Sequence, residues 1–424
     1  MTRAALDALG DRFEACFTAG TPTWRTLGRE AEFPLVNEDG TAADAAPVLA
    51  WLGRADPTLN EKREGEQLVA LYNERVEYTL EVGRGTMEVI VGPTEDLHQL
   101  QAAHDAAKAP FLDAADALGV TVLGYGIQPI TAATPAFMTP KSRYAVLLAT
   151  VGSPWLWFTL TASDQVHAAI GRDELVDATN ICNLLTPVTV ALCANSPVFS
   201  GSSSGSHSAR EARMGDIHAG TFRHGMPGGP DADARAMVRR LADQALLVTR
   251  RDGIIRAASG TFTEHLAGLD DETAWNDFLL HEHYIWNSAR PRTVHSTLEM
   301  RSACQQPLHE SGASAALSVG LVCGWRRLEA FVEEALGPEA WPTMHRYHAD
   351  VIKHGLSAPE PVDGFLAGVL ACCAAALAER DRGEEALLAP LFRRLETRRN
   401  PAQDALDAFA RGGMPALIRE TARR

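Results

Sequence analysis

The sequence has no long apolar run and little positive charge. No stretch of 18 apolar residues free of charge occurs among its 424 residues, and a membrane-spanning helix needs about that length. Residues 1–20 contain scattered charges instead of the clean apolar run of a secretory signal. The net charge of −15 argues against nucleic acid or an anionic membrane as a partner. We therefore predict a cytoplasmic protein whose partners are small molecules; no pattern indicates its oligomeric state.

The cysteines and histidines do not have the spacing typical of Cys-x-x-Cys proteins or of metal-dependent hydrolases. The seven cysteines form no Cys-x-x-Cys pair and their number is odd, which is typical of reduced thiols. Cys304 lies close to Arg301 in the chain, but a small buried apolar residue is its simplest interpretation. A metal-dependent hydrolase usually combines histidine ligands with a carboxylate. The nearest such pattern is His281-Glu282-His283, which we expect inside a helix.

Acidic residues, by contrast, recur at strand spacing. In residues 28–36, Glu30 and Glu32 alternate with apolar Ala31 and Phe33. Side chains on a strand alternate between its faces, so the two carboxylates point the same way, about 6.5 Å apart. Such a pair is tolerated if both groups are solvated, if one is protonated, or if cations lie between them. If this stretch is considered alone, the alternative is an exposed strand whose two carboxylates are simply solvated.

Two further stretches place acids on polar strand faces. Residues 76–91 predict a hairpin that turns at Gly83-Arg84-Gly85 and holds Glu81 and Glu88 near the turn. Residues 293–301 predict a strand in which Val294, Leu298 and Met300 are buried. Glu299 and Arg301 share its opposite face, where the acid and the base could simply pair with each other.

Together these stretches resemble the glutamate–cysteine ligase superfamily, in particular its plant-type and actinobacterial branches. Residues 124–129 and 138–144 are also similar to family segments and stand in the same order. The resemblance extends from about Thr26 to Arg301. The residues that match the three main motifs are Gly28, Glu30 and Glu32, then Leu80, Glu81, Gly83 and Glu88, and finally Leu298, Glu299, Met300 and Arg301.

The resemblance implies an α+β, glutamine-synthetase-like fold with a curved, mainly antiparallel sheet and surrounding helices. Residues 1–310 would form the catalytic core, and residues 311–424 a helical region packed on it. The implied enzyme uses ATP and Mg²⁺ to activate the γ-carboxylate of glutamate as an acyl phosphate, then joins it to cysteine as a γ-glutamyl amide. The alternatives are a ligase of this superfamily with another acid or amine, and a non-catalytic homologue that senses a ligand.

The resemblance also implies roles for particular residues. Arg301 would stabilise the transferring phosphoryl group, and Lys141 and Arg143 would contact the nucleotide phosphates, although Lys141 could equally be a solvated residue at a helix start. Carboxylates are the oxygen ligands that Mg²⁺ prefers, with Mn²⁺ as an alternative ion. The predicted metal ligands are Glu30, Glu32, Glu81, Glu88 and Glu299.

Five polar residues are the remaining candidates. Gln165 and His167 match a polar position that faces the metal or phosphate, although His167 could equally be structural. Arg213 lies in a run similar to one whose arginine holds the amino-acid substrate, and bidentate pairing with a carboxylate suits that role. Arg223 is a second anion contact, and Thr161 a further substrate contact. Either arginine could instead be a flexible surface residue.

The match to the plant-type pattern weakens at several positions. Leu160 replaces an arginine, and Asp164 precedes Gln165. His218 stands near the place of a tryptophan, and Arg29 and Ala31 replace threonine and histidine. None of these is one of the five glutamates. We therefore expect the activation of the carboxylate by ATP to be kept. Leu160 would make the acid pocket less basic, and the identity of the acid or of the amine stays open.

The rest of the chain gives coarse predictions of secondary structure. The Ser/Gly-rich residues 200–206 are either a linker or, as we favour, an active-site loop. We expect nearly everything from residue 311 onward to be helical. The other predicted elements are a loop over residues 53–67, a helix capped by Thr94 and ending near Leu118, a strand over residues 120–127, a long strand over residues 155–170, a helix over residues 173–195 kinked or divided at Pro187, and a helix over residues 231–250 capped by Asp231.

Overall fold

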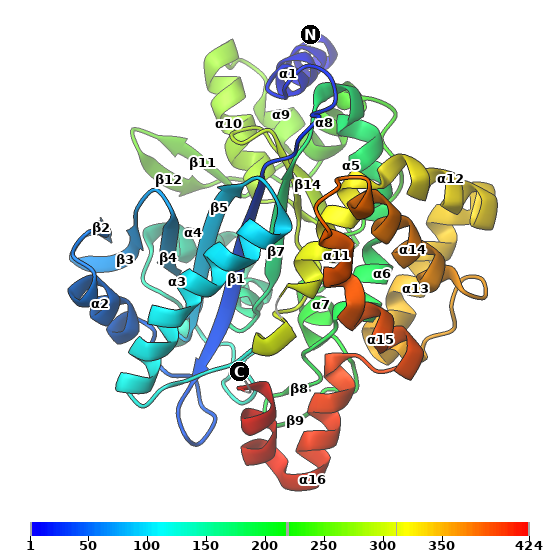
Figure 1. Ribbon diagram of the computed structural model, residues 1–424. Coiled ribbons are helices and arrows are strands. Elements are labelled where there is room, and N and C mark those ends of the chain that lie inside the picture. Colours follow the sequence, from blue (N-terminus) through cyan, green and yellow to red (C-terminus); the bar gives the residue numbers. More distant parts are fainter. Residues whose placement is uncertain (1, 218–219, 311, 423–424) are drawn as a thin grey trace.

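One long sheet organises the computed structural model, which describes residues 2–217, 220–310 and 312–422 (Figure 1). Its pairings are all antiparallel. A further strand, β6 (Thr121–Val122), pairs with the end of β1. The strands of the main path, in spatial order, are β14 (Ala289–Arg292), β15 (Thr297–Met300), β7 (Asp164–Ala169), β1 (Leu27–Val36), β5 (Thr86–Thr94), β4 (Val76–Leu80), β3 (Gln67–Tyr72) and β2 (Asn60–Glu64).

Helices surround this sheet. Helix α3 (Leu97–Ala117) lies across β5 and β1, where the rings of Phe33 and Phe111 approach to 5.6 Å between centroids. In the first 310 residues the helices are α1 (Thr2–Ala15), α2 (Ala46–Ala55), α3 (Leu97–Ala117), α4 (Ser142–Val151), α5 (Leu175–Leu184), α6 (Thr186–Cys193), α7 (Ala209–Met214), α8 (Ala234–Ala242), α9 (Phe262–His265) and α10 (Asp271–His283).

Alternation along β1 separates an apolar face from an acidic face. Ala31 and Phe33 are fully buried on the side that α3 covers. On the other side Glu32 stands opposite Glu88 of β5, and Glu30 stands opposite Gln165 of β7. Because strand side chains alternate with a period of two, this register gathers the acidic side chains of neighbouring strands on one face.

The C-terminal region is helical, as predicted, and packs on the sheet. Residues 313–322 of α11 are all buried, and the Ser314 hydroxyl of this helix donates a hydrogen bond to Asp164 of β7. The proposed boundary between residues 310 and 311 stays a prediction, and residue 311 lies outside the described residues. The helices are α11 (Ala313–Cys323), α12 (Trp325–Leu336), α13 (Ala340–His354), α14 (Phe365–Ala378), α15 (Ala389–Thr397) and α16 (Pro401–Thr421).

Three small sheets complete the described structure. β8 (Val198–Phe199) and β9 (Ser202–Ser203) form a short hairpin, and most of the Ser/Gly-rich stretch is an exposed part of it. β11 (Val248–Arg251) and β12 (Ile254–Ala257) form a second hairpin. β10 (His224–Gly225) pairs in parallel with β13 (Trp286–Asn287).

Two predicted elements differ in type from the structure. The expected long strand over residues 155–170 begins as a 3₁₀ helix, Ser153–Thr159, because Pro154 suits the start of a helix and Trp155 packs on Phe158 at 4.6 Å between ring centroids. The expected loop over residues 53–67 contains the end of α2 and the hairpin β2–β3. β2 is an exposed edge strand of charged residues, so it shows no apolar alternation.

Several predicted boundaries are wrong. Asp96, and not Thr94, caps α3 by accepting a hydrogen bond from the Gln99 amide, since β5 continues to Thr94. The strand predicted over residues 120–127 is only β6, Thr121–Val122. Helix α8 is capped by Asp233 and is shorter than residues 231–250. The divided helix around Pro187 is confirmed as α5 and α6.

The last predicted strand also begins later than expected. Residues 293–296 form the turn between β14 and β15. Val294, which was predicted to be buried, lies in that turn and is 79% exposed. The prediction that Val294 is buried, which rested on its apolar side chain, is therefore wrong.

Within the described ranges no single helix is long and apolar enough to cross a bilayer. One bent pair, residues 172–184 with Thr186–Cys193, has the required length and composition when the two are taken together. Every residue of α6 is buried within the protein.

Candidate active site

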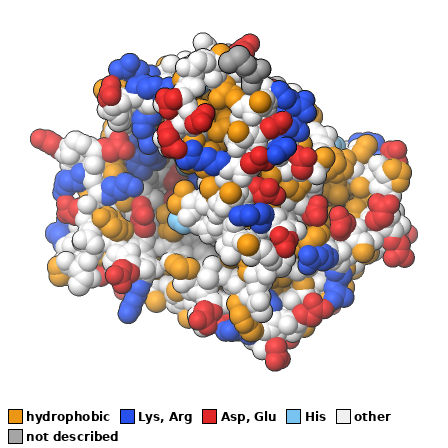
Figure 2. Space-filling view, turned by 90° about the horizontal axis from the view of Figure 1, so that it is seen from above, with side chains coloured by type: hydrophobic (Ala, Val, Ile, Leu, Met, Phe, Trp, Pro, Cys, Tyr) orange, Lys and Arg blue, Asp and Glu red, His pale blue; other side chains and the backbone are white. Residues whose placement is uncertain are grey.

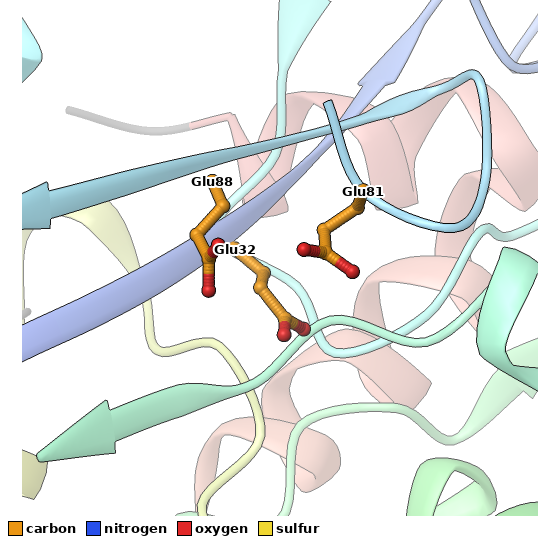
Figure 3. Close-up of side chains that lie close together, drawn as sticks. All are labelled: Glu32, Glu81 and Glu88. Carbon is orange, nitrogen blue, oxygen red and sulfur yellow. The ribbon is translucent and has the colours of Figure 1, made fainter. Parts of the chain in front are cut away.

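Three carboxylates from separate segments converge on the acidic face of the sheet. Glu32 lies on β1, Glu88 lies on β5, and Glu81 follows β4 (Figure 3). One oxygen from each lies within 4.8 Å of the others. The Gly83 turn places Glu81 here by close packing, because a Cβ on Gly83 would stand 1.8 Å from the Thr159 carbonyl oxygen.

The electrostatics of this carboxylate cluster favour a bound cation. Burial, together with the charge of Glu81, raises the pKa of Glu32 to about 7. The pKa of Glu88 is raised well above its usual value by burial and by the charges of Glu81 and Glu30. Three oxygen donors that repel one another suit a hard divalent cation such as Mg²⁺ or Mn²⁺. The donor set therefore fits the ion predicted from the sequence.

Gln165 orients this cluster and connects it to Arg301. Its amide nitrogen donates to Glu32 at 2.9 Å, and its amide oxygen accepts from the Arg301 guanidinium at 2.7 Å. The second oxygen of Glu32 accepts from the Ser163 amide at 2.6 Å. Hydrogen bonds of this kind fix the orientation of a carboxylate that holds a metal.

Glu30 and His167 form a neighbouring pair. The His167 Nε2 lies 3.0 Å from Glu30 and 3.9 Å from Glu299, while Nδ1 lies 3.1 Å from the Thr297 hydroxyl. Although burial opposes it, the charge and hydrogen bond of His167 lower the pKa of Glu30. The structure thus links the predicted Glu30, His167 and Glu299, beside the three-carboxylate cluster.

Glu299 is surrounded by arginines. Arg290 Nε lies 3.0 Å from both carboxylate oxygens, Arg292 lies at 3.4 Å, and Arg301 donates to the same group. Against the effect of burial, the charges of Arg290 and Arg301 hold the pKa of Glu299 well below its usual value. The pairing of Glu299 with Arg301 was considered from the sequence. Arg290 and Arg292 were missed, although the Arg-Pro-Arg alternation of β14 places both on the face of Glu299.

Lys141 and Arg143 lie beside the cluster. Lys141 is buried, and its ammonium group donates to the Leu80 carbonyl at 2.5 Å, so it is not a solvated residue at a helix start. Burial lowers its pKa, while the charges of Glu81 and Glu88 oppose that effect. The Arg143 guanidinium lies 4.9 Å from the centre of the Tyr144 ring.

The predicted substrate arginines have other partners. Arg213 pairs with Asp216 at 3.0 Å and lies over the Trp157 ring. Arg223 is buried and donates to the carbonyls of Tyr284, at 2.6 Å, and Ala245. Thr161 lies 3.7 Å from the sulfur of Met214. The structure therefore places Arg223 in a backbone-supporting position.

Arg210 is a further basic residue that sequence reasoning missed. It is buried on α7 and donates to the Arg301 carbonyl at 3.0 Å. Its charge lowers the pKa of Glu32 against the larger, raising effect of burial. The only signal was its place three residues before Arg213, in the same basic segment.

Among the described residues, the departures from the plant-type pattern are buried in the protein interior. Leu160 is fully buried in an apolar cluster with Tyr125 and Val198, and its effect on the acid pocket stays a prediction. Arg29 and Asp164 are fully buried and pair with each other. His218 lies outside the described residues.

Comparison with solved structures identifies the class of fold. The glutamate–cysteine ligase of Francisella tularensis, solved in complex with AMP, superposes with a TM-score of 0.60 at 14% identity, over 96% of this chain and 89% of that one. A bifunctional glutathione synthetase from Pasteurella multocida gives 0.52 at 11% identity, over 98% and 53%. The predicted α+β, glutamine-synthetase-like fold is confirmed.

Sequence comparison identifies the family. Residues 26–421 match the glutamate–cysteine ligase family 2, and the chain belongs to that family. A relative from Thermobifida fusca is 28% identical over 302 residues, 70% of this chain and 63% of its own length. The chloroplastic glutamate–cysteine ligase of Arabidopsis thaliana is 28% identical over 285 residues, 64% of this chain and 53% of its own. The chain thus spans under two thirds of these relatives.

Proposed function

We propose that this protein is an ATP- and Mg²⁺-dependent carboxylate–amine ligase. It would transfer the γ-phosphoryl group of ATP to the γ-carboxylate of glutamate and then join the acyl group to an amine, with cysteine as the default. The observation that supports this most strongly is the cluster of Glu32, Glu81 and Glu88. When bound there, a divalent cation would neutralise the repulsion between the two anionic substrates.

The basic residues would act on the phosphoryl group. Arg301 is held by Glu299 and Gln165, so its position is fixed before a substrate binds. A preorganised guanidinium stabilises charge that develops on a transferred phosphoryl group without having to reorient. Lys141 and Arg143 lie beside Glu81 and would hold the phosphate chain. Glu30, His167 and Glu299 would either bind a second cation or help to hold the cation at the cluster of Glu32, Glu81 and Glu88.

Arg210 joins Arg213 as a candidate for the carboxylate of the acid. Its guanidinium is fixed by the Arg301 carbonyl and lies close to Glu32. Among the described residues its Nε has no hydrogen-bond partner although it is buried, so one donor remains for a ligand. Thr161 stays a predicted substrate contact, and Arg223 stays one only if it leaves its two carbonyl partners.

The alternative hypothesis, a ligase that uses another acid or amine, has less support than it had from the sequence. Leu160, Arg29 and Asp164 all point into the protein interior, so their departure from the plant-type pattern does not reshape the acidic face. We therefore keep glutamate as the proposed acid. A non-catalytic homologue is disfavoured because the five glutamates are present and grouped on one face.

The direct test is ADP release from ATP with pairs of acids and amines. Glutamate with cysteine should release ADP and form the γ-glutamyl amide. Aspartate and monocarboxylic amino acids serve as alternative acids. ADP release with a different pair would keep the ligase and change the substrate, whereas no release with any pair would contradict the proposed activity.

A further inference from the structure

A buried carboxylate and two imidazoles meet beside Arg210. Glu211 follows Arg210 on α7, while His224 lies on β10 and His348 lies on α13. The Glu211 Oε1 oxygen lies 3.5 Å from His348 Nε2 and 3.8 Å from His224 Nδ1. Packing of α13 on α7 thus brings the C-terminal region to this carboxylate. We call Glu211, His224 and His348 the Glu–His group.

The Glu–His group is largely shielded from solvent. Figure 2 shows little histidine on the upper face of the molecule, and the side chains of Glu211, His224 and His348 are 1%, 7% and 16% exposed. Among the described residues, neither Glu211 Oε1 nor His348 Nε2 has a hydrogen-bond partner. Because buried polar atoms are nearly always paired, two unpaired atoms 3.5 Å apart indicate a ligand that contacts both.

The protonation of the group suits a positively charged ligand. Burial lowers the pKa of His224 to about 4, although the charge of Glu211 opposes this effect. The imidazole is therefore neutral at neutral pH, which is the form that binds a metal ion. Arg210 approaches the Glu211 carboxylate at its other oxygen, Oε2, at 3.4 Å. The Oε1 oxygen is thus available to a cation on the side of the two imidazoles.

The separations fit a shared metal ion better than direct hydrogen bonds. Hydrogen bonds between nitrogen and oxygen are about 2.7–3.2 Å long, and both contacts of Glu211 Oε1 are longer. Two ligands on one tetrahedral zinc ion lie about 3.3 Å apart, so the observed separations are larger by only about half an ångström or less. Nitrogen ligands favour zinc and other transition ions over Mg²⁺, and two histidines with one glutamate are a common donor set for zinc.

We propose that Glu211, His224 and His348 bind a divalent transition-metal ion, with zinc as the ion that the donor atoms fit best. This site is separate from the cluster of Glu32, Glu81 and Glu88, whose oxygen ligands suit Mg²⁺. A water molecule would complete the coordination of the ion. The ion would join α13 to α7 and so hold the helix that carries Arg210. The inference does not depend on the proposed ligase activity.

The test is calorimetric titration of the metal-free protein with Zn²⁺ in excess Mg²⁺, which occupies the carboxylate cluster. The wild type should bind one Zn²⁺ per chain. Glu211→Gln and His348→Gln should weaken this binding about 100-fold or more, because the loss of an outer-shell partner alone costs about 10- to 100-fold. Two control variants should bind Zn²⁺ like the wild type: His354→Gln, which changes an exposed histidine of the same helix, and Glu88→Gln, which alters the carboxylate cluster.

Co²⁺ in place of Zn²⁺ gives a second measurement on the wild type, because its visible absorption distinguishes nitrogen ligands from oxygen ligands alone. The melting temperature in EDTA shows whether each variant is folded. No Zn²⁺ binding by the wild type would overturn the inference, as would Zn²⁺ binding that persists in Glu211→Gln and His348→Gln or is lost in Glu88→Gln. A Co²⁺ spectrum of oxygen ligands alone would do the same. Wild-type protein that binds Zn²⁺ as expected but releases no ADP with any substrate pair would contradict only the proposed function.

Discussion

Arg29 of β1 and Asp164 of β7 form an ion pair in the protein interior, with hydrogen bonds of 2.7 and 2.8 Å and both side chains fully buried. Asp164 also accepts from Ser314 of α11. Two residues that depart from the plant-type pattern thus compensate each other and tie the C-terminal region to the sheet. Breaking a buried pair from one side leaves an uncompensated charge.

We therefore expect Arg29→Met to lower the free energy of unfolding by about 3–5 kcal/mol. The double variant Arg29→Met/Asp164→Leu should recover much of that loss, because both charges are then gone. Urea unfolding of the three proteins measures the difference. A single variant as stable as the wild type would show that the pair does not contribute as described.

Glu88→Gln should abolish turnover without unfolding the protein. Glu88 is buried among acids that raise its pKa, so its removal relieves repulsion in the metal-free protein. The melting temperature in EDTA should stay equal or rise, while ADP release should fall about 100-fold or more. Calorimetry and the ADP assay separate these effects. Retained turnover with strong destabilisation would instead indicate a structural residue.

Divalent cations should stabilise the wild type more than this variant. A ligand that binds only the folded state raises stability according to its concentration relative to its Kd. Mn²⁺ or Mg²⁺ should therefore raise the melting temperature of the wild type, and EDTA should reverse the rise. The variant Glu61→Gln, which changes an exposed acid on the edge strand β2, is the control and should respond like the wild type. An unchanged response in Glu88→Gln would remove the cluster as the binding site.

Stability should fall as the pH drops below about 6.5, partly because of His281. Burial lowers the pKa of this imidazole to about 3, and its Nε2 lies 2.8 Å from the Leu241 carbonyl oxygen. The unfolded chain, with an ordinary pKa near 6.5, binds more protons than the folded one between these values. The folded state then loses up to about 1.4 kcal/mol per pH unit from this residue.

His281→Gln should reduce that slope, since glutamine does not take up a proton in the unfolded state. Urea unfolding at several pH values between 7 and 4.5 measures it. An identical slope in the variant and the wild type would assign the acid sensitivity to other groups.

Local alternation predicts the acidic face well. Glu32 and Glu88 lie on strands whose apolar residues alternate with acids, so the sequence predicts which face of the sheet carries them. A short turn joins β4 to β5, so the sequence also predicts that these two strands are neighbours. The C-terminal helices follow from their composition in the same way. The carboxylate cluster is therefore close to what alternation and the family resemblance indicate.

Contacts between distant segments were not predictable in this way. Arg210 reaches the site from α7, and Arg290 and Arg292 reach Glu299 from a neighbouring strand, so their roles depend on tertiary packing. Leu160 was expected to face substrate because its motif neighbours do, but the 3₁₀ helix before β7 turns it into the core. One misjudged element type changes the direction of every side chain in it.

The central claim is that a substrate carboxylate first takes the γ-phosphoryl group of ATP to form an acyl phosphate. The amine then attacks this acyl phosphate and displaces inorganic phosphate. We propose to label that carboxylate with ¹⁸O, in the acid that releases ADP, and to measure the label in inorganic phosphate by mass spectrometry. An acyl phosphate intermediate transfers one carboxylate oxygen to phosphate when the amine displaces it. One ¹⁸O per phosphate released is the predicted result, and unlabelled phosphate formed together with the amide product would contradict it.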